Sequence, residues 1–131
     1  MWLNNLSPDQ RQALMRLAHN VVVSDGLLDP NEEGMLNEFR REMELSSEEV
    51  EYLELDGIGQ IFASRESRIV ALLNLIKLSY ADGAFEIEEE CLVREICHAF
   101  QVGDEEFLLL DNWVRRLNAL EDEAGEFIKG Q

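Results

Sequence analysis

An internal repeat dominates this sequence and relates two parts of the chain at one fixed offset. Placing Asp25-Gly26 over Asp82-Gly83 sets the offset at 57 residues (82 − 25), and the register then holds without a gap for about forty residues. The apolar positions agree across it: Val21 with Leu78, Leu28 with Phe85, Met35 with Leu92, Phe39 with Ile96 and Met43 with Phe100. We therefore predict two copies of one helix–Asp-Gly–helix unit, at about residues 13–53 and 70–110.

Both copies carry the sequence signals of helices. Apolar residues recur three and four positions apart, and no segment alternates with the period of a strand. Capping residues indicate where helices start, as with Ser7 before Pro8. The predicted helices begin near Ser7, Asp29, Ser46, Glu66, Glu88 and Gly103, with a loop or short helical turn at Asp56–Gly59 and a tail expected to fray after about Asp122. The prediction is an all-α fold, a compact helical domain of about seven helices whose two units pack about a pseudo-two-fold axis.

Length and charge limit what such a domain can do. The chain has 131 residues, the size of one domain, so residues 1–131 are predicted to form a single helical domain. The 28 Asp and Glu residues against 11 Lys and Arg give a formal net charge of −17. Such a surface repels phosphate, so neither nucleic acid nor an anionic membrane surface is expected as a partner. Metal cations and basic proteins complement it, although the acidity by itself would also serve solubility.

The remaining composition is typical of a cytoplasmic protein. No signal segment is visible at Met1, and no run of about 18 apolar residues could span a membrane. Cys91 and Cys97 are too far apart for a CxxC site and are expected to be buried, reduced thiols. His19 and His98 occupy unrelated positions of the repeat, so a histidine-based metal or catalytic site is not expected.

Each Asp-Gly segment presents at least three carboxylates within eight residues, around a helix break. These candidate metal ligands are Asp25, Asp29 and Glu32 in the first copy and Asp82, Glu86 and Glu89 in the second. Hard oxygen ligands of this kind suit Ca²⁺ or Mg²⁺. The spacing imitates the second half of an EF-hand loop, but the first half would place Val21 and Val23 at ligand positions, so an EF-hand is rejected. The alternative is structural, since the same residues could cap helices and form turns.

This doubled motif resembles that of the TerB-like family of tellurite-resistance-associated proteins. A helix ends in a small residue followed by Asp-Gly, an aliphatic residue, then Asp or Ser, with Glu seven positions after the first Asp. The pattern appears at Ser24–Glu32 and again at Ala81–Glu89, and the resemblance covers roughly residues 13–110. By position, Asp25, Glu32, Asp82 and Glu89 match the family's acidic sites, whereas Glu86 departs from the usual Asp or Ser. The resemblance implies an all-α fold with internal duplication, an acidic cluster proposed to bind divalent metal, and a role in bacterial stress response and metal-linked protein assemblies.

The sequence supports three hypotheses of function. The first is a non-enzymatic cytoplasmic module that binds a divalent cation, Ca²⁺ or Mg²⁺, through both Asp-Gly segments, with protein partners in a stress-response complex. The second is a metal-free protein-interaction domain, with Trp2, Trp113 and Phe127 as candidate contacts. The third, a hydrolytic enzyme with paired carboxylates, is disfavoured because no nucleophile arrangement, phosphate-binding loop or zinc signature is present, so no catalytic residues and no other cofactor are expected. The sequence does not specify an oligomeric state.

Overall fold

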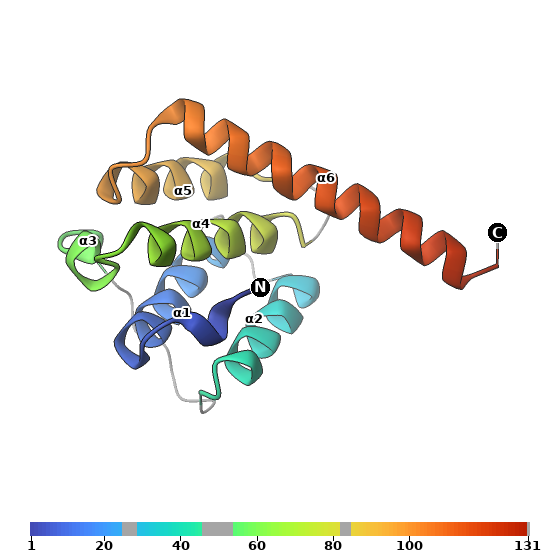
Figure 1. Cartoon of the computed structure of the whole chain (residues 1–131), viewed down its shortest axis with the longest axis horizontal. Helices are drawn as coiled ribbons and strands as arrows, with labels where there is room; N and C mark the ends of the chain where they lie inside the picture. Colours follow the sequence, from blue (N-terminus) through green and yellow to red (C-terminus); the bar gives the residue numbers. More distant parts are fainter. Residues whose placement is uncertain (25–28, 46–53, 82–84, 131) are drawn as a thin grey trace.

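The computed structural model describes residues 1–24, 29–45, 54–81 and 85–130, and every regular element in these ranges is helical. In chain order the elements are the 3-10 helix η1 (Leu3–Asn5) and the α-helices α1 (Pro8–Val22), α2 (Pro30–Glu42), α3 (Ile58–Ile61), α4 (Arg65–Ser79), α5 (Ile87–Ala99) and α6 (Asp104–Ile128), as Figure 1 shows. The all-α prediction is confirmed. The short helix predicted to open at Ser46 lies outside the described residues, and the break at Asp56–Gly59 leads into the short helix α3.

The predicted duplication is visible in the bounds of the helices. α1 and α4 have 15 residues each, and α2 and α5 have 13 each. Both ends of α4 lie 57 positions after those of α1 (65 − 8 and 79 − 22), and the same offset relates α5 to α2 (87 − 30 and 99 − 42). The repeat in the sequence is therefore a repeat of the helix pair itself.

Equivalent serines begin the first helix of each pair. The Oγ of Ser7 accepts a hydrogen bond from the backbone N–H of Gln10 at 3.3 Å, and the Oγ of Ser64 accepts one from the N–H of Ser67 at 3.1 Å. Each bond satisfies one of the N–H groups that a helix leaves unpaired at its start. Because Ser64 is the cap, α4 begins at Arg65, one residue before the predicted start.

Equivalent residues with a left-handed backbone end the second helix of each pair. Glu44 has φ 58° and Gln101 has φ 61°. In each copy the next residue, Leu45 or Val102, donates its N–H to the carbonyl five residues earlier, at 2.8 Å in both cases. This bond closes the helix as a left-handed glycine commonly does. The chain turns in the same way in both copies although neither has glycine there.

α6 is the longest helix, with 25 residues. It packs against α4 and α5 and buries Phe107, Asp111 and Val114, whereas its second half extends past the other helices (Figure 1). The expected fraying after Asp122 is wrong, because the helix continues to Ile128. Glu and Ala, both good helix formers, make up half of residues 121–128.

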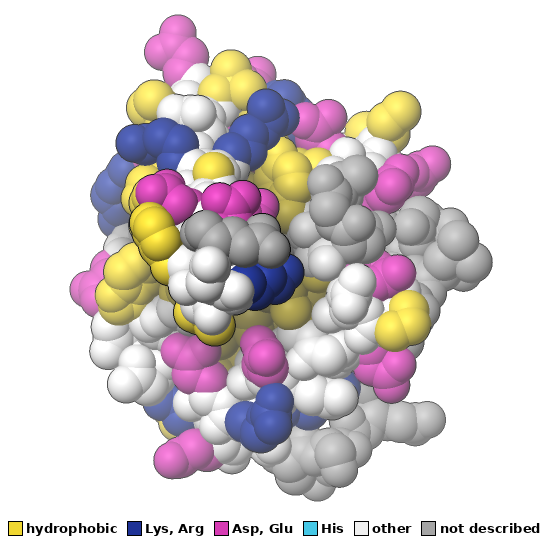
Figure 2. Space-filling model, turned by 90° about the vertical axis from the view of Figure 1, so that its right-hand side faces the viewer, with side chains coloured by type: hydrophobic (Ala, Val, Ile, Leu, Met, Phe, Trp, Pro, Cys, Tyr) yellow, Lys and Arg dark blue, Asp and Glu magenta, His cyan; other side chains and the backbone are white. Residues whose placement is uncertain are grey.

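The surface is mixed in character on the side toward which α6 extends. Figure 2 looks onto this side, where acidic, basic and hydrophobic side chains all reach the surface. In the part of the chain that the structure describes, no helix combines the length and the apolar character needed to cross a membrane.

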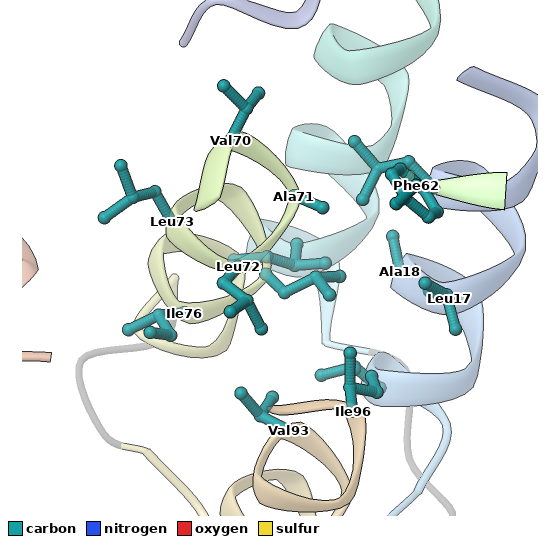
Figure 3. Packing of buried hydrophobic residues seen from close by; sticks show 14 of the residues in the cluster. Leu17, Ala18, Phe62, Val70, Ala71, Leu72, Leu73, Ile76, Val93 and Ile96 are labelled. Atoms are coloured by element: carbon teal, nitrogen blue, oxygen red, sulfur yellow. The ribbon is translucent and has the colours of Figure 1, made fainter. Parts of the chain in front are cut away.

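α4 is the central helix of the core. It packs against α1, α2, α5 and α6. Its buried residues surround the helix rather than forming one stripe: Ser67, Val70, Ala71, Leu72, Leu73, Asn74, Leu75, Ile76, Leu78 and Ser79. Figure 3 shows Leu72 on the side of α4 that faces α5, where Val93 is labelled. A helix that is apolar on most sides belongs in a protein interior, and α1, α2, α5 and α6 together enclose α4.

Two arginines at equivalent positions, Arg11 in α1 and Arg68 in α4, join the ends of each copy. Arg68 donates three hydrogen bonds to backbone carbonyls, those of Phe62 (2.6 Å), Gly59 (2.7 Å) and Phe100 (3.0 Å). Arg11 makes three bonds of the same kind, to the carbonyls of Asn4 (2.8 Å), Leu6 (3.0 Å) and Met43 (3.1 Å). Each guanidinium thus ties the segment before its helix to the end of the following helix.

Candidate functional site

The structure describes four of the six predicted metal ligands, those at the start of α2 and α5. They are Asp29, Glu32, Glu86 and Glu89, whereas Asp25 and Asp82 lie outside the described residues. In each copy the two described carboxylates occupy the same two positions, the N-cap and the third residue of the helix. The backbone N–H groups and the dipole at a helix start favour negative charge there.

Part of this arrangement is helix capping. The carboxylate of Asp29 accepts a hydrogen bond from the N–H of Asn31 at 2.8 Å. In the second copy, Glu89 Oε1 accepts a hydrogen bond from the N–H of the N-cap residue Glu86 at 3.3 Å, as in a capping box. The structural alternative considered for these residues is therefore present at the start of both helices.

Glu32 and Glu89 are buried, with 2% and 1% of their surface exposed. Removing a carboxylate from water costs free energy unless hydrogen bonds or positive charge compensate for it. The helix start supplies part of this compensation. Because the burial occurs at equivalent positions, it is a property of the repeated unit and not of one local environment.

A hollow of about 530 Å³ lies between the start of α2, the end of α4 and the second half of α6. The residues that line it are Asn31, Met35, Lys77, Tyr80, Ala81, Asn118, Glu121 and Asp122. Since Asn31 belongs to the first Asp-Gly motif and Ala81 to the second, this hollow adjoins both. Lys77 joins α4 to α6 beside it, donating hydrogen bonds to Glu121 Oε1 at 2.6 Å and to Asn118.

Tyr80, Asp111 and Arg115 form a hydrogen-bonded cluster at the end of α4 that the repeat pattern does not reveal. The Tyr80 hydroxyl donates to Asp111 Oδ1 at 2.7 Å, and Arg115 Nε donates to the Tyr80 hydroxyl at 2.9 Å. Burial, followed by the hydrogen bond to Asp111, raises the pKa of Tyr80 above its ordinary value. The sequence signal for the cluster is an Asp at helical spacing from Phe107 and Val114, on the apolar face of α6.

The described carboxylates have the donor chemistry of a hard cation site but do not complete one. Among the described residues, no three His, Cys, Asp or Glu side chains are grouped so that they could hold a metal ion. A three-carboxylate site within either Asp-Gly segment therefore has to include Asp25 or Asp82. Carboxylate oxygens are the ligands that Ca²⁺ and Mg²⁺ prefer, so the residues of the motif fit such an ion in chemical type.

The histidines and cysteines take separate positions. His19 is half-buried on α1, and His98 is exposed on α5. Cys97 is buried as expected, and burial raises the pKa of its thiol to about 12. The expectation for Cys91 is wrong, because this residue is exposed. It lies two residues before the buried Val93 and therefore on the opposite side of α5.

Comparison with protein families places both Asp-Gly segments in one known family. The family model described as "Tellurite resistance protein TerB" matches the chain in two segments, residues 3–55 and 55–112. The chain belongs to the TerB family. The resemblance drawn from the doubled motif is confirmed, and TerB membership associates the chain with tellurite resistance. Comparison with curated proteins and with solved structures gave no significant match.

The extent of the TerB matches separates two parts of the molecule. Both helix pairs, both Asp-Gly segments and all six predicted ligands lie within the matched residues. The part of α6 from residue 113 to residue 128 lies beyond them. The TerB repeat therefore accounts for the helical body and leaves the extending part of α6 as a feature of its own.

Proposed function

We propose that this TerB protein is a non-enzymatic cytoplasmic module that binds a divalent cation, Ca²⁺ or Mg²⁺, through its two Asp-Gly segments. The observation that supports it most is the burial of Glu32 and Glu89 at equivalent positions, one in each copy. A cation next to a buried carboxylate compensates the loss of hydration that burial imposes. Capping by itself does not call for burial, since a capping carboxylate works equally well at the surface.

The charge of the protein supports a cation as the compensating group. The net charge is −17, and carboxylates held close together raise one another's pKa and oppose folding. The proposed ligand sets are Asp25, Asp29 and Glu32 in one copy and Asp82, Glu86 and Glu89 in the other. Lys77, a basic side chain at the adjoining hollow, is already paired with Glu121. A bound metal ion would place positive charge next to the carboxylates of the Asp-Gly segments.

The TerB family's association with tellurite resistance suggests the setting in which the module works. We propose that cation binding fixes the two Asp-Gly segments and so prepares the module to bind other proteins of a stress-response complex. In this scheme the protein changes shape or affinity when the cation binds and carries out no chemical step.

A metal-free interaction domain is the second candidate function. It is favoured by the capping bonds of Asp29 and Glu89, which give these carboxylates a structural use. It is also favoured by exposed aromatic residues, since Trp2 and Phe127 lie largely at the surface while Trp113 is half-buried against Trp2.

Thermal unfolding with and without metal separates the two candidates. A ligand that binds the native state raises the unfolding midpoint by mass action, and an ion at a hundred times its dissociation constant adds about 2.7 kcal/mol. We expect millimolar Ca²⁺ or Mg²⁺ to raise the midpoint on the order of 10 °C. We expect the variant Asp25→Asn/Asp82→Asn to lose this response.

The control is Glu38→Gln/Glu95→Gln, which removes two exposed carboxylates that are also related by the repeat. It changes the net charge by the same amount as the test variant but lies outside the Asp-Gly segments. It should keep the full response to the metal. An equal loss of response in both variants would show general screening of the acidic surface and would contradict a site. No response in the unaltered protein to Ca²⁺, Mg²⁺, Mn²⁺ or Zn²⁺ would favour the metal-free function.

A further inference from the structure

An apolar stripe runs along one side of α6. Its members, which we call the α6 seam, are Leu109, Trp113, Leu117, Leu120, Ala124 and Phe127. They are three or four positions apart, so they lie on one face of the helix, over a length of about 27 Å. Three of them are largely in solvent, with 68% of Leu109, 62% of Leu120 and 71% of Phe127 exposed. Natural monomers rarely expose apolar surface in so continuous a form.

The seam is not the side of α6 that packs on the body. That side carries the buried residues Phe107, Asp111 and Val114, and it continues into Asn118 and Glu121, which bond to Lys77. On a helical wheel the centre of the seam lies about a third of a turn from the centre of this side, and Leu117 is the seam residue nearest to it. Its first part therefore lies along the flank of the body, and its second part lies on the extending half of α6 (Figure 1).

We infer that the α6 seam is the contact between two copies of this chain, packed antiparallel about a two-fold axis. In one register of such a pair, Leu117 lies opposite Leu120 of the second copy, and Trp113 lies opposite Ala124. The bulky ring then meets the smallest side chain of the seam, which suits close packing between helices. Phe127 reaches the level of the exposed Leu109 on the flank of the other body. A two-fold contact of this kind covers both parts of the seam at once.

The order of charges along α6 favours a second copy over another apolar partner. The basic residues Arg115 and Arg116 lie at the middle of α6, and the acidic residues Glu121, Asp122, Glu123 and Glu126 follow them. In the register that pairs Leu117 with Leu120, Arg116 lies beside Glu123 of the second copy, and symmetry repeats the pair. Opposite charges at such flanking positions set the partner and the orientation of paired helices.

Trp2, which lies beside the seam, adds to its apolar surface. Trp2 lies against Trp113, with ring centroids 6.2 Å apart, and about half of Trp2 is exposed. Trp2 therefore widens the apolar surface of the seam where α6 packs against the other helices. Because the seam lies almost entirely outside the Asp-Gly segments and extends beyond the TerB matches, this inference does not depend on metal binding.

Sedimentation equilibrium of the full chain tests the inference, with EDTA present to exclude any effect of metal. At concentrations from about 1 to 200 µM and 0.15 M salt, we expect a reversible shift from the 15.1 kDa chain to twice that mass. Leu120→Glu places a charge in the seam and is expected to raise the dissociation constant at least about tenfold. Leu108→Glu makes the same change at an exposed leucine outside the seam and is expected to leave it unchanged.

A charge exchange tests the antiparallel register. Arg116→Glu and Glu123→Arg are each expected to weaken the dimer, because each places like charges opposite one another twice. The double variant Arg116→Glu/Glu123→Arg is expected to recover most of the affinity. Circular dichroism establishes that each variant keeps its helices. A chain that stays monomeric throughout, equal effects of the two leucine variants, or no recovery in the double variant would overturn the inference.

Discussion

Replacing Arg68 by methionine is expected to lower the free energy of unfolding by about 4 kcal/mol. The guanidinium donates hydrogen bonds to the carbonyls of Gly59, Phe62 and Phe100, at 2.6 to 3.0 Å. A hydrogen bond from a charged donor contributes about 1.5–3 kcal/mol, and carbonyls left without a partner add their own desolvation cost. Methionine fills similar space but offers no donor. Urea unfolding followed by circular dichroism measures the loss.

Three further variants test the three hydrogen bonds that the Arg68 guanidinium donates. Arg68→Lys keeps the charge but cannot reach three carbonyls with one ammonium group, so most of the loss is expected to remain. Arg41→Met, at an exposed position of α2, is expected to cost less than about 1 kcal/mol. Arg11→Met should match Arg68→Met, because the repeat gives it the same three bonds. If Arg68→Met behaved like Arg41→Met, the proposed role of this arginine would be contradicted.

Replacing Leu72 by alanine is expected to cost about 3–5 kcal/mol. The side chain is fully buried at the centre of α4, on the side that faces α5 (Figure 3). Truncation removes apolar contacts and leaves a cavity that three packed helices cannot close. Thermal and urea unfolding give the change in stability.

The matched control for this cavity is Leu108→Ala, which makes the same truncation at an exposed site outside the α6 seam and is expected to cost less than about 1 kcal/mol. Where Leu72→Ala does not fold, Ile76→Val removes a single methylene from the same helix and should cost about 0.5–1.5 kcal/mol. Equal stabilities for the Leu72 and Leu108 variants would contradict the central place of α4.

The helical framework was predictable because each helix carries its own start signal and apolar period. Ser7 and Asp29 mark starts that the structure reproduces, and the offset of 57 residues recurs in the bounds of both helix pairs. The central position of α4 was harder to predict from the sequence, because a helix with buried residues on all sides has no amphipathic pattern. The burial of α4 depends on the helices packed around it, and their arrangement follows from the whole chain and not from the sequence of α4.

The candidate site was predictable in composition but not in environment. The spacing of acids identified Glu32 and Glu89, yet their burial depends on packing that spacing alone does not contain. The three hydrogen bonds of the Arg68 guanidinium were not predicted for a similar reason, because their acceptors are backbone carbonyls, which every residue possesses. One signal was available: Arg11 and Arg68 are themselves related by the repeat.

Cation binding at the duplicated Asp-Gly segments is tested most directly by amide-resolved NMR of the full chain during titration with Ca²⁺ and Mg²⁺. We expect saturable shifts in the amides of Ser24–Glu32 and Ala81–Glu89, absent from Asp25→Asn/Asp82→Asn and retained in Glu38→Gln/Glu95→Gln. Shifts that leave both segments unchanged, or that spread over the acidic surface without saturating, would contradict it.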